Sequence, residues 1–527
     1  MRKLIAVLAL AVLASCGKDP ATNSTAKGGN ASGGGKVLVY ARGNDSDHLD
    51  PHNTSSGESV KVTNQIFETL VDFAEDSPKV VPSLATKWDM SEDGKTWTFE
   101  LREGVTFHDG TPFDSEAVVF SLNRLRNPND PNRHGAKSEY ESCYEVIEDV
   151  KSDGPHRVVI RLKTPFAPFL ANLAMFPAAM ISPAAVIKHK TDFGRNPVGT
   201  GPFRFEKWVP NAKIVLSGNK EYWGGRPKVD KLIFKVVPDN SNRLLDLRNG
   251  EAHIMDGLNC ADIGEINRDP SITAIEAPGM NFGYLAMNTE KPPLDNKKVR
   301  QAVAHAIDKK RLVQLVTFGH GQVAVNPIPP TVWGYNDSIE DWPHDVEKAK
   351  SLLAEAGFPD GVDVELWAMT NPRPYMPEPK RVVAVLMEDL ARAGIRVKAV
   401  ENEFNAHLPA TKNGQHEMCI LGWITDNGDP DNFLNELLSS KKAVHGTAAN
   451  VSFFRNARYD ELVERAQIVT DEGERARLYR EAQVVIHEEC PMVPLLYMPE
   501  ACALRKAVKG YKLHPMGLIR LRNVDLE

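Results

Sequence analysis

The segments VDVELWA at residues 362–368, VVAVLMEDLARAG at 382–394, IRVKAV at 395–400 and MCILGW at 418–423 decide the fold. The first, third and fourth are short alternating or apolar runs, which are typical of strands. The second has apolar residues at helical spacing and ends at a glycine, as many helices do. With a short helix expected over 406–413, the order is strand, helix, strand, helix, strand. This order predicts right-handed crossovers and a largely parallel sheet.

Two charged residues, Arg373 and Asp426, follow the first and the third of these strands. In such sheets, ligands bind outside the carboxyl ends of the strands. Pro372 and Pro374 restrict the backbone around Arg373 and so preset the direction of its side chain. A structural salt bridge is the alternative role for a single Arg. Taken together, a cation for a carboxylate and an anion for an ammonium describe a site for a zwitterion with both termini free.

The acidic run after the third strand also raises the question of a metal site. An EF-hand loop that began at Asp426 would need Gly at position 6 and Glu at position 12, where the chain has Asp431 and Leu437. We therefore expect a turn with Asx hydrogen bonds at Asp429 and Asp431. The run DHLDPH at residues 47–52 could ligate a metal, but a solvated loop is the favoured interpretation. No metal and no cofactor are expected.

Signals for catalysis or nucleic-acid binding are weak. There is no GxSxG, no HExxH and no GxxxxGK[ST] motif, and His487-Glu488-Glu489-Cys490 lacks the second His. The formal charge is −7, and no long block of Lys and Arg appears, so we expect no nucleic-acid partner. We assign no catalytic residue and expect no enzyme.

The N-terminus has the pattern of an export signal. Arg2 and Lys3 precede an apolar run that is too short to cross a bilayer, and Leu13-Ala14-Ser15-Cys16 resembles a bacterial lipobox. Residues 1–16 are then a lipoprotein signal peptide whose Cys16 is lipidated, and residues 17–35 are a flexible tether. A simple secretory signal with a chance Cys is the alternative. We expect a periplasmic or cell-envelope protein that touches the membrane only through this lipid.

Five further cysteines remain after Cys16, and their number is odd. We expect them to be buried small hydrophobic residues, with a pair between Cys490 and Cys502 as an open possibility.

The chain has two regions that differ in their sequence pattern. Short strands dominate from Lys36 to about Ala277, which indicates a mixed β-rich α+β half, whereas helices alternate with strands from about Gly283 to Met498.

Several sequence blocks occur in an order that resembles a known family. They are PSLATKW at 82–88, SEDGKTWTF at 91–99, LREGVTFHDG at 101–110, NPVGTGPF at 196–203, YW at 222–223, VRQA at 299–302 and WGY at 333–335. The chain thereby resembles the extracellular solute-binding proteins of family 5, the peptide and nickel group that serves ABC importers. The resemblance implies an α/β, two-lobed periplasmic-binding-protein fold around a hinge, of the large cluster C type with an extra subdomain in lobe one.

The resemblance also implies the domain boundaries. Lobe one would comprise residues 36–278 and 500–527, with an inserted subdomain at about 75–190. Lobe two would comprise residues 279–499. Two crossing strands would join the lobes, one of them at 281–288.

Within this family, the likeness is to the dipeptide-binding members, through Arg373-Pro374-Tyr375 and the segment from Gly422 to Asn432. It implies that Asp426 pairs with the α-ammonium of a peptide and Arg373 with its α-carboxylate. The other ligand-binding residues that it implies are Tyr375, Gly422, Trp423, Phe404, Tyr140, Ser56 and Gly57. Ile424 and Thr425 depart from the family pattern, which leaves the side-chain preference of the site open.

The expected function is to capture dipeptides in a closing cleft and to deliver them to the membrane permease of an ABC importer. We expect the protein to act as a monomer. Two alternatives stay open. The first is a relative that binds haem, glutathione or a longer oligopeptide, and the second, of another class, is a surface lipoprotein peptidase.

Overall fold

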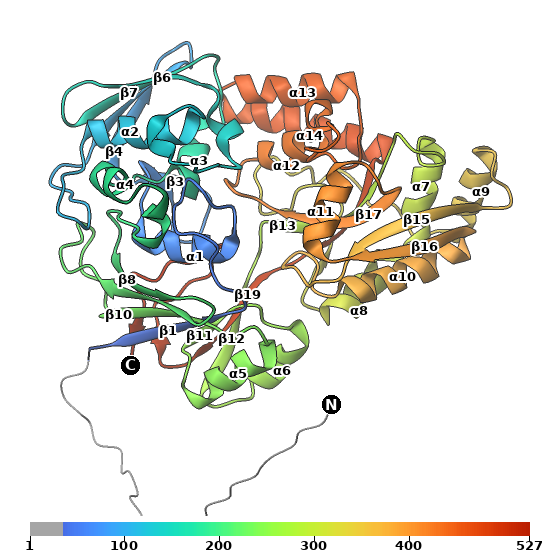
Figure 1. The fold of residues 1–527 in the computed structure, drawn as a ribbon. Coiled ribbons are helices and arrows are strands. Elements are labelled where there is room, and N and C mark those ends of the chain that lie inside the picture. Colours follow the sequence, from blue (N-terminus) through green and yellow to red (C-terminus); the bar gives the residue numbers. More distant parts are fainter. Residues whose placement is uncertain (1–34) are drawn as a thin grey trace, which may run out of the picture. The chain divides into compact units, whose positions relative to one another are not determined.

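Two large mixed sheets organise residues 35–527, the part of the chain that the computed structural model describes (Figure 1). In the first sheet β1 runs parallel to its neighbours β10 and β11, and the other pairings are antiparallel. In order across the sheet, its strands are β12 (Ile272–Ala277), β19 (Glu500–Arg505), β11 (Ile254–Met255), β1 (Val37–Arg42), β10 (Lys231–Val236), β9 (Lys213–Gly218) and β8 (Phe203–Val209).

The second sheet contains the strand–helix–strand unit predicted from the sequence. Its order is β14 (Gln322–Val323), β18 (Met492–Tyr497), β13 (Asn281–Met287), β17 (Met418–Ile424), β15 (Val362–Met369) and β16 (Ile395–Asn402). Only β15–β16 and β15–β17 pair in parallel. The prediction of a largely parallel sheet was therefore wrong. Strands β13, β14 and β18 come from distant parts of the chain and pair antiparallel, so the sheet is mixed.

Three smaller sheets contain the remaining strands. An antiparallel four-stranded sheet has the order β4 (Ala85–Met90), β5 (Thr96–Leu101), β7 (Arg157–Leu162) and β6 (Ile147–Ser152). The pairs are β2 (Val71–Phe73) with β3 (Val80–Pro82) and β20 (Val508–Lys509) with β21 (Asp525–Leu526).

The α-helices are amphipathic or short, and the apolar sides of the longer ones are buried. They are α1 (Gly57–Ile66), α2 (Ser115–Arg126), α3 (Phe169–Leu173), α4 (Pro183–His189), α5 (Asn240–Asn249), α6 (Ile263–Ile266), α7 (Lys297–Ala306), α8 (Lys309–Thr317), α9 (Val346–Glu355), α10 (Pro379–Arg392), α11 (Phe404–Lys412), α12 (Asp431–Leu438), α13 (Ala457–Ile468) and α14 (Glu472–Glu489). Helix α10 buries Val382, Leu386 and Leu390, packs on β15 and β16, and ends before Gly394, which has a positive φ of 86°.

The chain passes between the two large sheets at two adjacent places. Strand β12 ends at Ala277 and β13 begins at Asn281, while β18 ends at Tyr497 and β19 begins at Glu500. The Asn281 side chain joins these crossings, because its Nδ2 donates to the Met498 carbonyl (3.0 Å) and its Oδ1 accepts from the Met498 N–H (3.2 Å). Both links between the sheets are therefore short and hydrogen-bonded to each other.

The five cysteines that the structure describes are all unpaired. The possible pair between Cys490 and Cys502 is therefore wrong. Cys419, Cys490 and Cys502 are buried, as small hydrophobic residues would be, and Cys143 and Cys260 are half-buried. Among the helices of residues 35–527, none has the length and apolar character needed to cross a bilayer. The predicted signal peptide and Cys16 lie outside the described residues.

The expectation of a solvated loop at residues 47–52 was wrong for Asp50 and His52, which are each 2% exposed. Arg124 of α2 lies 2.5 Å from the Asp50 carboxylate and donates to His52 Nδ1 (2.9 Å). Since Arg can only donate, Nδ1 accepts, and Nε2–H donates to the Ala179 carbonyl (3.0 Å). Burial together with the Arg124 charge lowers the pKa of His52 to about 4, so this His is neutral. The cluster is a buried structural network.

We expect Arg124→Met to lower the free energy of unfolding by about 3 to 5 kcal/mol, because it leaves the buried Asp50 carboxylate without its cation. Denaturant unfolding followed by circular dichroism measures the loss. The matched control is Arg157→Met, which removes an exposed Arg paired with Asp153 and should leave the midpoint unchanged. Equal midpoints for wild type and Arg124→Met would contradict the structural role of this network.

Candidate functional site

Arg373 lies in a tight turn beyond the carboxyl end of β15. The turn is closed by two backbone hydrogen bonds between Arg373 and Met376, of 3.0 and 2.9 Å. The guanidinium carbon lies 3.4 Å from the centroid of the Phe404 ring at the start of α11, a cation–π contact that holds the side chain in place. Burial lowers the pKa of Arg373, and its Nε is buried without a hydrogen-bond partner. Arg373 forms no ion pair with any residue of 35–527.

Tyr375 holds this turn against the sheet. It packs on Gly422 of β17, where an added Cβ would lie 2.2 Å from Tyr375 Cδ2, and its carbonyl would lie 2.6 Å from a Cβ on Gly283 of β13. Gly283 and Gly422 face each other across the two strands. Any larger residue at either position would push Tyr375 away, so the glycine pair fixes the turn that carries Arg373.

Asp426 lies two residues beyond the end of β17. Asn432 of α12 ties this loop to the strand, because its Oδ1 accepts from the Asp426 backbone N–H (3.0 Å) and from Trp423 Nε1 (2.9 Å). The Tyr140 hydroxyl donates to Asp426 Oδ1 (3.1 Å). Burial raises the pKa of Asp426 to about 6, although the Tyr140 hydrogen bond lowers it. Within the described part of the chain, Asp426 has no ion-pair partner.

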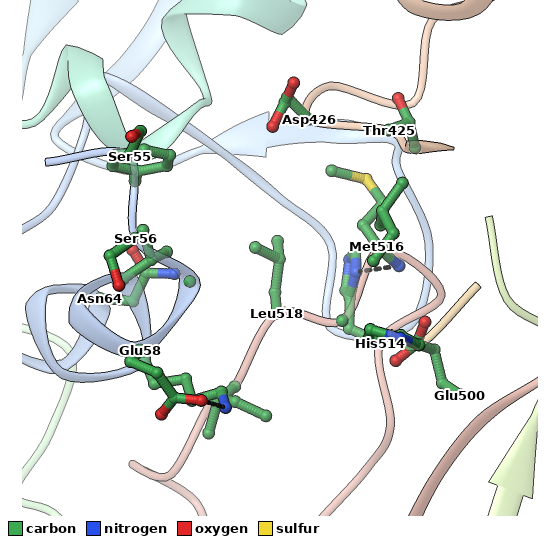
Figure 2. A pocket seen from close by; sticks show the side chains of 18 of the residues that line it. Ser55, Ser56, Glu58, Asn64, Thr425, Asp426, Glu500, His514, Met516 and Leu518 are labelled. Carbon is green, nitrogen blue, oxygen red and sulfur yellow. Dashed lines mark hydrogen bonds and ion pairs between the residues drawn. The ribbon is translucent and has the colours of Figure 1, made fainter. Parts of the chain in front are cut away.

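Strands β15 and β17 are parallel neighbours, so the loops that follow them leave the same edge of the sheet. A cavity of about 2230 Å³ lies at this edge. Its lining includes all nine residues predicted for the ligand, namely Ser56, Gly57, Tyr140, Arg373, Tyr375, Phe404, Gly422, Trp423 and Asp426. In Figure 2 the Asp426 carboxylate points into the open space, with Ser55, Ser56 and Glu58 across from it.

The residues of the facing wall come from the part of the chain that builds the first sheet and its insertions. Ser56 is the N-cap of α1, although its side chain makes no capping hydrogen bond, and Gly57 is the first residue of the helix. Tyr140 packs edge-on against Phe176, with ring centroids 5.2 Å apart. Ser56, Gly57 and Tyr140 are uncharged, so among the nine predicted residues both charges lie in loops that follow strands of the six-stranded sheet.

The other two carboxylates of the acidic run have structural contacts. The Asp429 carboxylate forms a buried ion pair with Arg475 (2.8 Å). Asx hydrogen bonds run from the Asp429 N–H to Asn427 Oδ1 (2.9 Å) and from the Asp431 N–H to Asp429 Oδ1 (3.0 Å). The turn predicted for these two residues is confirmed. In the described part of the chain, no group of three or more His, Cys, Asp or Glu residues is arranged to hold a metal ion.

Two contacts were missed from the sequence. In the sequence, Asn432 was named only as the last residue of the segment that resembles the dipeptide-binding members. In the structure, its side chain orients both Trp423 and Asp426. Phe404 was predicted only as a ligand-binding residue, whereas the guanidinium of Arg373 lies over one face of its ring. No spacing rule signals either contact, because each depends on the path of a loop.

The chain matches one protein family and is similar in sequence to a dipeptide-binding and a heme-binding protein. Residues 79–444 match the family described as "Bacterial extracellular solute-binding proteins, family 5 Middle". The chain is 38% identical to the dipeptide-binding protein of Escherichia coli (strain K12), over 93% of this chain and 95% of the relative. It is 36% identical to heme-binding protein A of Haemophilus influenzae, with 100% of both chains covered.

Among solved structures, the chain is similar to an ABC transporter-associated periplasmic binding protein from Helicobacter pylori in complex with the peptide STSA. The TM-score is 0.83 and the identity 35%, and the match covers 93% of this chain and 98% of that chain. The two large sheets described above are thus those of a two-lobed periplasmic-binding-protein fold. On the combined evidence of sequence and structure, the chain belongs to family 5 of the bacterial extracellular solute-binding proteins.

Proposed function

We propose that this protein captures dipeptides by their two free termini and delivers them to the permease of an ABC importer. The observation that carries the proposal is the pair Arg373 and Asp426, which line one cavity and have no ion-pair partner among residues 35–527. Asp426 would receive the α-ammonium and Arg373 the α-carboxylate. The dipeptide-binding relative from Escherichia coli supports this choice of ligand.

The energetics favour recognition of the termini over recognition of the side chains. A partly buried charge without a partner is costly, and a ligand that brings the opposite charge removes the cost. The cavity is far larger than a dipeptide needs, so water can fill the space around different side chains. Bridging waters cost only about 0 to 2 kcal/mol each. The proposal therefore combines a fixed peptide length with a broad choice of side chains.

Closure would follow from contacts on both lobes. We propose lobes of residues 36–278 with 500–527 and of residues 279–499, hinged where the chain crosses near Asn281 and Met498. Ser56, Gly57 and Tyr140 would contact a ligand already held by lobe two. Such a ligand shifts the open form toward the closed form by its differential affinity for the two, and the permease would bind the closed form.

We further propose that the protein is a monomer without enzymatic activity, attached to the cell envelope through a lipid on Cys16. The order Leu, Ala, Ser, Cys after an apolar run supports the anchor. The family consists of extracellular solute-binding proteins, which agrees with export.

Haem is a second candidate ligand, because the similarity to heme-binding protein A extends over both whole chains. Titration with haemin, followed by its absorption spectrum, separates the candidates. A spectral change that Ala-Ala cannot compete away would favour a separate haem function. If the absorption spectrum of haemin does not change, haem is excluded and dipeptides remain the single proposed ligand.

We expect Asp426→Asn and Arg373→Ala each to weaken binding of Ala-Ala by about 2 to 5 kcal/mol, since each leaves one peptide terminus without its counter-charge. Isothermal titration calorimetry gives the affinities. For the wild type, N-acetyl-Ala-Ala and Ala-Ala amide should lose affinity in the same range.

The matched controls are Asp363→Asn and Arg396→Ala. These residues are exposed, pair with each other, and lie near the starts of β15 and β16, at the ends of these strands away from Arg373. These two variants should bind Ala-Ala as the wild type does. Equal binding of Ala-Ala and its two blocked forms would refute recognition of the termini.

Binding should weaken as the pH falls through the Asp426 pKa of about 6, because only the carboxylate attracts the ammonium. With one titrating group, affinity for Ala-Ala at pH 5 should be about tenfold lower than at pH 7, below the α-amino pKa of about 8. Calorimetry across this range measures the profile. In Asp426→Asn the remaining binding should lose most of this dependence, and an unchanged profile would assign the titration to another group.

Cys16→Ser should move the protein from the membrane fraction to the soluble fraction of the cell envelope, because the lipid would be its only membrane contact. Fractionation and immunoblotting of a bacterial host that expresses the full chain measure the distribution. A Ser15→Ala variant keeps the Cys and should stay membrane-bound. Retention of Cys16→Ser in the membrane would contradict the lipid anchor.

A further inference from the structure

Glu500 is a charged group of the cavity that the proposed recognition of the termini does not use. It is the first residue of β19, next to the crossing between the two large sheets. Glu500 lines the same cavity as Asp426, and Figure 2 shows its side chain beside His514. A ligand held at Asp426 therefore lies in a cavity that the Glu500 carboxylate also lines.

The carboxylate of Glu500 has few partners. Asn281 Nδ2 donates to its Oε1 at 3.3 Å, and within residues 35–527 it forms no ion pair. Lys61 favours its charged form but donates its hydrogen bonds to Glu58 and Asp256. Burial raises the pKa of Glu500 to about 7. The group is thus an acceptor without a cation of its own.

The His beside this part of the cavity supplies no positive charge. His514 Nδ1 accepts from the Met516 N–H (3.2 Å), and Nε2 donates to the Ser77 carbonyl (3.1 Å). Because Nδ1 accepts, the ring is neutral. Burial lowers the pKa of His514 to about 4, which agrees with a neutral ring.

Apolar surface lies beside the Glu500 carboxylate. Met516 and Leu518 line the same cavity as Glu500, and Figure 2 shows both of them near His514. The side chains of Lys and Arg combine an aliphatic stem with a cationic tip, and they bury the stem along apolar surface. The arrangement of apolar wall and free carboxylate matches that shape.

Resting on the proposed dipeptide function, we propose that Glu500 makes this cavity selective for dipeptides with a basic side chain. The cationic tip pairs with Glu500, while the stem lies along Met516 and Leu518. Ion pairing in a partly desolvated cavity stabilises the complex more than the same pair in water. The inference concerns only the side chain, because Asp426 and Arg373 hold the termini.

Calorimetry with two pairs of peptides tests this. Lys-Ala is compared with norleucine-Ala, and Ala-Lys with Ala-norleucine; norleucine has the Lys stem without the amine. In at least one pair, the Lys peptide should bind about tenfold tighter. Glu500→Gln should reduce that ratio to about one, and Glu500→Asp, which keeps the charge, should retain a preference. Glu378→Gln removes another carboxylate from the cavity lining and should leave the ratio unchanged.

Two outcomes would overturn the inference alone. One is a ratio near one for both pairs in the wild type, and the other is an equal weakening of Lys and norleucine peptides by Glu500→Gln, which would indicate a role in the hinge. If neither Ala-Ala nor any of the four peptides binds, the proposed function fails and this inference fails with it.

Discussion

The approach of Tyr375 to the six-stranded sheet is the constraint on which the candidate site depends. Gly283 and Gly422 are paired across β13 and β17, and a Cβ on either would overlap Tyr375. The missing side chains let the loop after β15 lie flat against these neighbouring strands. Arg373, two residues before Tyr375, is thereby held at the edge where β17 ends and Asp426 follows. Two small residues thus set the position of a charge far from them in the sequence.

Arg373 and Asp426 differ in their ion pairing from two buried carboxylates elsewhere in the protein. Two buried carboxylates elsewhere have cations: Asp50 has Arg124 and Asp429 has Arg475. In those pairs the two charges bind each other and can contribute to the specificity of the fold. Neither charge is therefore available to a ligand. Arg373 and Asp426 lack such partners in the described residues and face a cavity. Stability would favour pairing them, and the proposed dipeptide, which carries both opposite charges, would pair with each.

The sequence predicted local elements well and long-range relations less well. The crossover unit was correct because the periods of its strands and of α10 are local properties. The parallel character was overestimated, since the neighbours of β17 include β13, whose residues lie more than 100 positions away. Asp50 and His52 were placed in solvent because polar composition does not show that Arg124 will cover them. Arg373 and Asp426 were predicted from their positions after two strands, and the other ligand residues came from the family resemblance. The contacts of Asn432 and the stacking of Phe404 under Arg373 required coordinates.

The distribution of charge between the two walls also bears on how closure could work. Both Arg373 and Asp426 lie on the six-stranded side, while Ser56, Gly57 and Tyr140 on the other wall are neutral. A zwitterion can therefore pair with both charges before the walls approach. The Tyr140 hydroxyl already donates to Asp426, and a neutral donor can share that carboxylate with an ammonium. What closing adds is the removal of water, which strengthens ion pairs that already exist. On this argument the ligand favours the closed form mainly because its own charges are better stabilised in a drier cavity.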